Sequence, residues 1–319
     1  MVAHWIHSFK IPSSTCKELE KLFANFIWKG KMHAYSWAEI CKPKEEGGLG
    51  IRKLEDINAS AGLKLIWKLC TTDSLWSLWM RERYYKNNTF WEASISSLDS
   101  GTWKFLTNLQ EVAANNMSQN FETGSWSWNA TSNGSFTFKS AWNIIRCPSS
   151  VFEFNTLIWY AANSPKMSCC LLRVLKNRLL IQDRLHNFRI IQELQCVLCN
   201  TGIESIQQCP YTSCLWTLCK LKLQLHPSIS NLVEEAQNLI IKFKKKMRVS
   251  YIARISFSAT IWHTWQMVRN RRIFQLEQMS KILVFRNLYE DIHILVQNCH
   301  WKSTGDQKDN EILSNWGMY

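Results

Sequence analysis

The residues best suited to chemistry in this 319-residue chain are two cysteines separated by two residues, Cys196 and Cys199. A tight turn between them directs both sulfurs to one point, which suits a tetrahedral Zn²⁺ ion. Zinc needs further ligands, and Cys209 follows ten residues after the pair. Other Cys and His side chains flank the region at longer range, namely Cys214, Cys219, His186 and His226. The alternative is that these are structural thiols, because the chain contains 12 cysteines.

Other catalytic patterns are absent from the sequence. It contains no His-Glu-x-x-His, Gly-x-Ser-x-Gly or Walker pattern and no adjacent pair of aspartates. The glycines at 47, 48 and 50 are not followed by Lys-Ser/Thr and follow no strand, so they predict a tight turn and not a phosphate loop. A thioredoxin-like redox pair would need a βαβ pattern around Cys196 and Cys199, which is not seen. We expect no enzymatic activity and no small-molecule substrate.

Basic residues exceed acidic ones, giving a formal net charge of +13. Residues 1–150 contain 17 basic and 13 acidic groups, whereas residues 151–319 contain 21 and 12. Two stretches, 166–189 and 242–286, hold most of the excess. Clustered basic charge favours RNA or DNA as partner, because neutralising phosphates releases counterions. The nucleic-acid-binding candidates are Lys166, Arg173, Lys176, Arg178, Arg184, Arg269, Arg271 and Arg272. The alternative is a solvated helix face.

The first residues and the apolar segments of the chain indicate whether the protein is secreted or inserted in a membrane. Residues 1–7 show neither the basic nor the apolar region of a secretory signal. No run approaches the roughly 18 apolar residues of a membrane span. We therefore expect reduced thiols, no membrane partner and an intracellular protein, with nucleus and cytoplasm left undistinguished.

Hydrophobic periodicity predicts a mainly α fold with several helical segments, one short β-hairpin and a small zinc-knuckle-like module. Helices are expected at 15–30, 54–70, 74–85, 140–145, 154–162, 165–180, 182–192, 211–223, 230–247, 250–274 and 280–297. The hairpin is expected near 125–138, because Trp126 and Trp128 alternate with serines before Asn133-Gly134, and Phe136 and Phe138 alternate after it.

Composition divides the chain near Cys147-Pro148-Ser149-Ser150, the best linker candidate. We expect a helical region at 1–146 that includes the hairpin, a cysteine-containing module at 151–220 and a helical extension at 230–298. The tail at 303–319 is polar and is expected to be loose.

Blocks along most of the chain, taken in order, resemble the C-terminal region of plant LINE-type (non-LTR) retroelement reverse transcriptases. The first half carries FIWKG at 26–30, WAEICKPKEEGGLGIR at 37–52, Asn58, and the 126–142 segment. The second half carries IW at 158–159, PK at 165–166, NRLL at 177–180, DRL at 183–185, the Cys pair, ES at 204–205, CPYTSCLW at 209–216, IWHTW at 261–265 and RNRRIF at 269–274. The resemblance implies a thumb-like and connector region followed by a reverse transcriptase zinc-binding domain.

The departures from the family pattern shape the expected function. In the family the polymerase palm with its paired aspartates lies upstream, and it is absent here, so we expect a truncated, non-catalytic remnant. Carried over by position, Cys196, Cys199 and Cys209 are three zinc ligands. The family's His ligand is missing, because the 204–209 segment is several residues short, so we expect zinc to be weak or absent. The competing readings are a nucleic-acid-binding remnant, ranked first, a helical interaction or structural protein, and an enzyme of unknown type.

Overall fold

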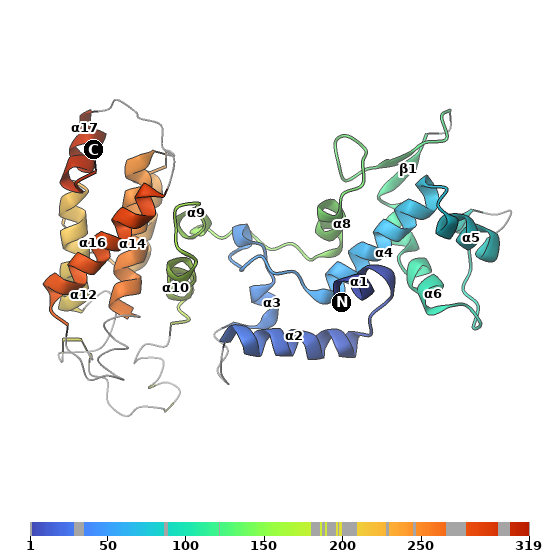
Figure 1. The fold of residues 1–319 in the computed structure, drawn as a ribbon, viewed down its shortest axis with the longest axis horizontal. Helices are drawn as coiled ribbons and strands as arrows, with labels where there is room; N and C mark the ends of the chain where they lie inside the picture. The colour runs from blue at the N-terminus through green and yellow to red at the C-terminus, as the bar shows by residue number, and fades with distance from the viewer. Residues whose placement is uncertain are drawn as a thin grey trace. The chain divides into compact units, whose positions relative to one another are not determined.

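The computed structural model describes residues 2–28, 35–85, 89–120, 122–179, 186, 189, 196, 198–199, 209–227, 230–244, 247–265, 279–298 and 307–318. Two compact units divide the chain: unit 1 is Met1–Pro43 with Gly48–Ser150, and unit 2 is Lys44–Gly47 with Val151–Tyr319. The described residues are mainly helical and contain one two-stranded antiparallel sheet, so the predicted fold class is confirmed (Figure 1). Within these ranges no helix is both long enough and apolar enough to cross a membrane.

Helix α4 (Leu54–Thr71) is the centre of unit 1, and several helices pack against it (Figure 1). Leu63, Ile66 and Leu69 on α4 are fully buried at the spacing of one helical face. The other elements of the unit are α1 (Val2–Ser8), α2 (Ser13–Trp28), α3 (Trp37–Ile40), α5 (Leu75–Tyr84), η2 (Phe90–Glu92), α6 (Gly101–Thr107), α7 (Gln110–Ala114), β1 (Met117–Gln119), β2 (Trp126–Trp128) and α8 (Phe138–Ile145).

The core of unit 1 is rich in aromatic rings. Trp103 is buried, and Tyr84 stacks on it with ring centroids 4.3 Å apart and an interplanar angle of 6°. Trp128 on β2 is fully buried, contacts Trp67 and Phe136 edge-on, and donates its indole N–H to Ser140 Oγ at 2.9 Å. These rings bury large apolar areas and join the sheet to α4 and α8.

The hairpin lies elsewhere than predicted. β2 pairs with β1, with Met117 opposite Trp128, and not with residues 135–138. Asn120 closes the connection by accepting from the Glu122 and Thr123 backbone, and Gly124 has a positive φ of 66°. Phe138 instead starts α8, because Thr137 caps that helix by accepting from Ser140 N at 3.1 Å. A capping signal thus overrides the alternating pattern.

Helix α14 (Arg248–Trp262) is buried over most of its length and is the centre of unit 2. Around it pack α10 (Pro165–Leu175), α12 (Pro210–Lys222), α16 (Lys281–Gln297) and α17 (Gln307–Asn315). Figure 1 shows α14 and α16 running side by side. The unit is completed by α9 (Asn155–Ile158), α13 (Leu232–Lys242) and the 3₁₀ helix η1 (Lys44–Glu46).

Helix α10 is shorter than the predicted 165–180. It begins at Pro165, whose ring suits the first helical position. It ends at Leu175, and Asn177 then adopts a left-handed φ of 51°. A left-handed residue just past the last turn is a common helix stop, and asparagine tolerates it better than most residues. The helix predicted at 182–192 and the 266–274 part of the helix predicted at 250–274 contain too few described residues, or none, for comparison.

The expected loose tail is wrong for residues 307–318. This segment forms α17 (Gln307–Asn315), which the fully buried Trp316 follows directly. The Trp316 carbonyl accepts hydrogen bonds from Tyr289 and His293 of α16, and its indole stacks on Tyr289 at 5.6 Å. The apolar residues that anchor the segment, Ile312, Trp316 and Met318, are few and stand among polar residues. Because polar residues surround them, these three residues form no apolar pattern from which the sequence could predict a packed segment.

His263 lies just after α14 and is buried, and its Nε2 is 3.0 Å from Asp291 Oδ2 on α16. Burial lowers the pKa of His263 below its ordinary 6.5, and Lys166 adds to this, although Asp291 acts in the opposite direction. The folded state therefore favours neutral His263, whereas the unfolded chain takes up a proton near pH 6.5. The free energy of unfolding therefore decreases as the pH falls from about 6.5 toward the lower pKa of His263 in the folded state.

We expect the melting temperature to fall more steeply between pH 7 and pH 5.5 in the wild type than in His263→Gln, which cannot titrate. Thermal unfolding followed by circular dichroism across this range measures the two slopes. Equal slopes would show that His263 takes up its proton equally in both states.

Candidate metal centre

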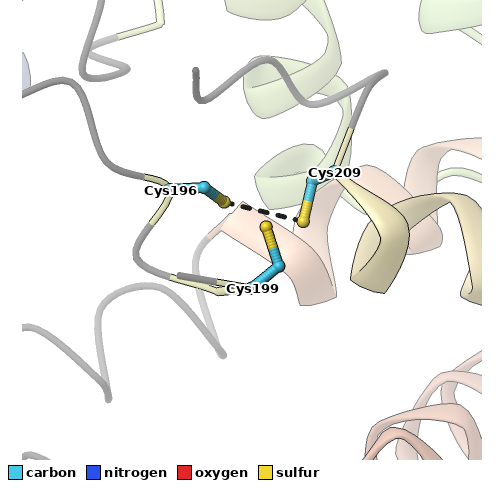
Figure 2. Close-up of side chains that lie close together, drawn as sticks. All are labelled: Cys196, Cys199 and Cys209. Atoms are coloured by element: carbon cyan, nitrogen blue, oxygen red, sulfur yellow. Dashed lines mark hydrogen bonds between the residues drawn. The ribbon is translucent and has the colours of Figure 1, made fainter. Parts of the chain in front are cut away.

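Three cysteine side chains of unit 2 converge at one place (Figure 2). Cys196 and Cys199 come from one loop, and Cys209 is the residue directly before α12, with Pro210 at the first helical position. The three sulfurs lie within 4.8 Å of one another, and Cys196 Sγ is 3.6 Å from Cys209 Sγ. Figure 2 shows the three thiols pointing toward a common point. The structure thus brings together the residues that the cysteine spacing and the family resemblance selected.

The thiol geometry fits a zinc ion. With Zn–S bonds of about 2.3 Å, two sulfurs on a tetrahedral zinc are separated by roughly 3.8 Å. The 3.6 Å between Cys196 and Cys209 is close to this separation. The residues present therefore fit zinc as three of its four ligands.

No fourth Cys, His, Asp or Glu joins the group within the described ranges. Cys214 is on α12 and is outside the cluster, whereas Cys219 is buried 3.6 Å from Thr260 Oγ1. His186 and His226 are not part of the cluster either. Gln208 lies outside the described residues.

Apolar packing holds the cluster in place. Leu198, Tyr211 and Leu215 are buried beside the cysteines, together with Met279 and Val284. Tyr211 also donates its hydroxyl hydrogen to the Met279 carbonyl at 3.1 Å. This bond spans 68 residues of sequence and ties the start of α12 to the residue before the capped start of α16. Buried apolar side chains therefore fix the positions of the three thiols.

Burial raises the pKa of the Cys196 thiol to about 12. Backbone hydrogen bonds from Cys199 and Leu198 oppose the rise, whereas the neighbouring Cys199 and Cys209 side chains add to it. Cys196 is therefore protonated at neutral pH without a cation. Because zinc binds the thiolate, metal binding must release this proton.

We expect the apparent zinc affinity to rise with pH between 6 and 8, by up to about tenfold per pH unit for each proton released. A competition titration against a chromophoric chelator at several pH values measures it. Cys147→Ser alters an exposed cysteine outside the cluster and is the matched control. A pH-independent affinity would contradict binding through protonated thiols.

The predicted nucleic-acid-binding residues are only partly described. Lys166, Arg173, Lys176 and Arg178 lie on α10 or directly after it. Lys166 is half-exposed, with its Nζ 5.4 Å from the Trp262 ring centroid and 4.0 Å from Asp291 Oδ2. Lys176 Nζ is 5.3 Å from the Phe152 ring centroid. Arg184, Arg269, Arg271 and Arg272 lie outside the described residues.

Residues 136–216 match the family described as zinc-binding in reverse transcriptase. The match begins before α8, ends within α12, and includes Cys196, Cys199 and Cys209. The expected resemblance to a reverse transcriptase zinc-binding domain is confirmed over these residues. The convergence of the three thiols agrees with the zinc-binding description of this domain.

Two curated proteins of Arabidopsis thaliana are similar to parts of the chain. A "putative ribonuclease H protein" is 33% identical over 91 residues, which cover 27% of this chain and 15% of that protein. An uncharacterized mitochondrial protein is 28% identical over 111 residues, which cover 33% of this chain and 72% of that protein. The chain thus spans a small part of the first relative and most of the second. No solved structure matches the chain.

Sequence reasoning missed an internal ion pair of unit 2. Lys220 on α12 is 4% exposed and donates to Glu235 on α13, which is 7% exposed. Glu235 also accepts from Trp216 Nε1 at 3.1 Å and Ser230 Oγ at 2.7 Å. Lys220 reads as one of several basic residues near a helix C-terminus, so no local signal distinguishes it.

Proposed function

We propose that this chain is a non-catalytic, retroelement-derived reverse transcriptase module whose zinc-binding domain supports a basic surface for RNA or DNA. The convergence of Cys196, Cys199 and Cys209 within the family-matched segment carries the proposal. Three thiolates would hold the ion, and it would fix the loop that contains Cys196 and Cys199 against the start of α12. A structural zinc site contributes to folding in this way.

The metal part of the proposal has a direct test. We expect purified protein to bind zinc, but to lose it to a chelator more readily than a site with four protein ligands. Metal analysis before and after chelation measures this, with Cys209→Ser as the variant that removes a ligand. Zinc content unchanged in Cys209→Ser would contradict the three-thiolate site.

The nucleic-acid part rests on charge. Residues 151–319 hold 21 basic groups against 12 acidic ones, and Lys166, Arg173, Lys176 and Arg178 lie along or just after one helix. We expect the full chain to bind single-stranded RNA at low salt. The logarithm of its affinity should fall linearly with the logarithm of salt concentration, with a slope of about −0.7 for each phosphate contact. A flat or undetectable response in this titration removes nucleic-acid binding from the proposal.

A helical protein-interaction module is the second candidate, and an exposed apolar face on α2 favours it. Phe26 is 82% exposed and Leu22 is 63% exposed on that helix. Large exposed apolar side chains that cluster are typical of interaction surfaces. The salt titration separates the two candidates, because an interaction module without nucleic-acid contacts gives no salt-dependent RNA binding.

A further inference from the structure

A cavity of about 510 Å³ lies in unit 2, and its lining includes none of the three clustered cysteines. Its volume is within the range of small-molecule sites in proteins. The lining combines aromatic rings, side-chain amides, a hydroxyl and charged groups, among them Lys44, Glu45, Trp159, Tyr160, Asn163 and Ser168. Such a wall differs from an apolar packing defect, because it offers stacking faces, hydrogen-bonding groups and a cation together.

Hydrogen bonds hold one wall of the cavity in place. The Ile158 carbonyl at the end of α9 accepts from Asn163 Nδ2 at 3.1 Å and from the buried Ser168 at 2.9 Å. The Oδ1 of Asn163 in turn accepts from Ser258 of α14 at 3.2 Å. Tyr160 packs on Tyr251 of α14 with ring centroids 5.8 Å apart. A ligand would thus meet a wall that is already ordered, which reduces the entropy cost of binding.

Helix η1 supplies the other wall, and it comes from a distant part of the sequence. The Glu45 carbonyl accepts from Phe152 N at 2.8 Å and from Asn155 Nδ2 at 3.4 Å. Lys44 Nζ lies over the Trp159 ring, 4.8 Å from its centroid. The exposed Lys44 side chain therefore covers an aromatic face that a flat ligand could occupy.

Among the described residues that line the cavity, Lys44 is the basic one, and Arg173 of α10 lies near it without lining the cavity. Burial raises the pKa of Cys169, and the nearby Arg173 and Lys44 both oppose the rise, so both cations act on this one position. Lys176 lies over Phe152, the residue bound to η1. Glu45 is the one acidic side chain in the cavity lining. The Lys44 ammonium beside the Trp159 and Tyr160 rings suits a ligand that joins a flat ring to an anionic group.

We propose that this cavity binds one unpaired nucleotide of a single-stranded nucleic acid, with the base stacked on Trp159 and Tyr160 and its phosphate held by Lys44. The inference rests on the proposed nucleic-acid binding and adds a site to it. Base stacking on aromatic side chains tolerates any sequence, because every base has a π-face. Lys44 would leave the indole face as the base enters and would pair with the phosphate.

The test uses the full chain and a single-stranded 12-nucleotide RNA of mixed sequence, with affinity measured by fluorescence anisotropy at several salt concentrations. We expect Trp159→Ala to weaken binding by about 5- to 150-fold with an unchanged salt slope, because stacking does not release counterions. We expect Lys44→Ala to make the plot of log affinity against log salt concentration shallower, by about 0.7 in the magnitude of its slope. Trp79→Ala and Lys64→Ala remove an exposed tryptophan and an exposed lysine of unit 1 and are the matched controls.

Two further measurements keep the inference falsifiable. Trp159→Phe retains a stacking ring and should recover most of the affinity even where Trp159→Ala is unstable. A 12-nucleotide strand of abasic residues should bind the wild type as weakly as the RNA binds Trp159→Ala. Equal binding of the RNA and the abasic strand by the wild type, or full affinity in Trp159→Ala, would overturn the cavity assignment alone. Absence of RNA binding by the wild type at low salt would overturn the proposed function itself.

Discussion

Replacing Glu235 with alanine is expected to destabilise unit 2 by about 3–5 kcal/mol, because it leaves the buried Lys220 ammonium without the Glu235 carboxylate. Lys220 is 4% exposed, so its ammonium has little contact with solvent to compensate for the lost interaction. Trp216 Nε1 and Ser230 Oγ lose their acceptor as well. Chemical denaturation of the full chain, followed by a probe of unit 2, measures the change.

A double-variant comparison isolates the cause. Lys220→Met with Glu235→Gln removes both charges and keeps an oxygen acceptor for Trp216 and Ser230, so we expect it to recover most of the lost stability. Glu290→Ala breaks the exposed Arg286–Glu290 pair of α16 and should cost only a few tenths of a kcal/mol. A loss in Glu235→Ala as small as that in Glu290→Ala would show that the buried pair is not needed for stability.

Replacing Trp128 with alanine is expected to destabilise unit 1 by about 3–5 kcal/mol. The side chain is fully buried between α4 and α8, and it joins β2 to both helices. Its loss leaves a cavity beside Trp67 and Phe136 and removes the hydrogen bond to Ser140. Thermal or denaturant unfolding monitored by circular dichroism measures the loss.

Trp128→Phe separates packing from hydrogen bonding. Ser140 Oγ retains its bonds to Thr137, so we expect Trp128→Phe to be much milder than Trp128→Ala. Trp79→Ala removes a tryptophan of α5 that is 56% exposed and should change stability little. Similar losses in Trp79→Ala and Trp128→Ala would contradict the assignment of Trp128 to the core.

Local signals predicted the helices best. Ser280 accepts from Leu283 N and starts α16 within a residue of the predicted start, because side-chain capping acts over one turn. The cysteine cluster was also accessible, since Cys196 and Cys199 are close in sequence and family order identified Cys209. Each of these features needs information from a few neighbouring residues or from a known pattern.

Features that depend on distant contacts were not predictable in the same way. The Lys220–Glu235 and His263–Asp291 pairs join residues from different segments, and each residue alone reads as a solvated or core position. The predicted position of the hairpin was wrong because Met117–Gln119 carries no alternating pattern in the sequence. This segment nevertheless pairs with Trp126–Trp128, whose Trp128 is buried in the core. Tertiary packing decides such positions.

Helix η1 has a consequence for dividing the protein into fragments. Lys44–Gly47 belongs to unit 2, although the residues on both sides belong to unit 1. A polypeptide that starts at Val151 would lack the Glu45 carbonyl to which Phe152 N and Asn155 Nδ2 donate. Such a fragment would have an altered surface beside α9, and supplying the 44–47 segment as a separate peptide would not restore the local concentration that chain connectivity provides. Cleaving the chain after Ser150 would therefore not yield two fragments that each contain a whole unit.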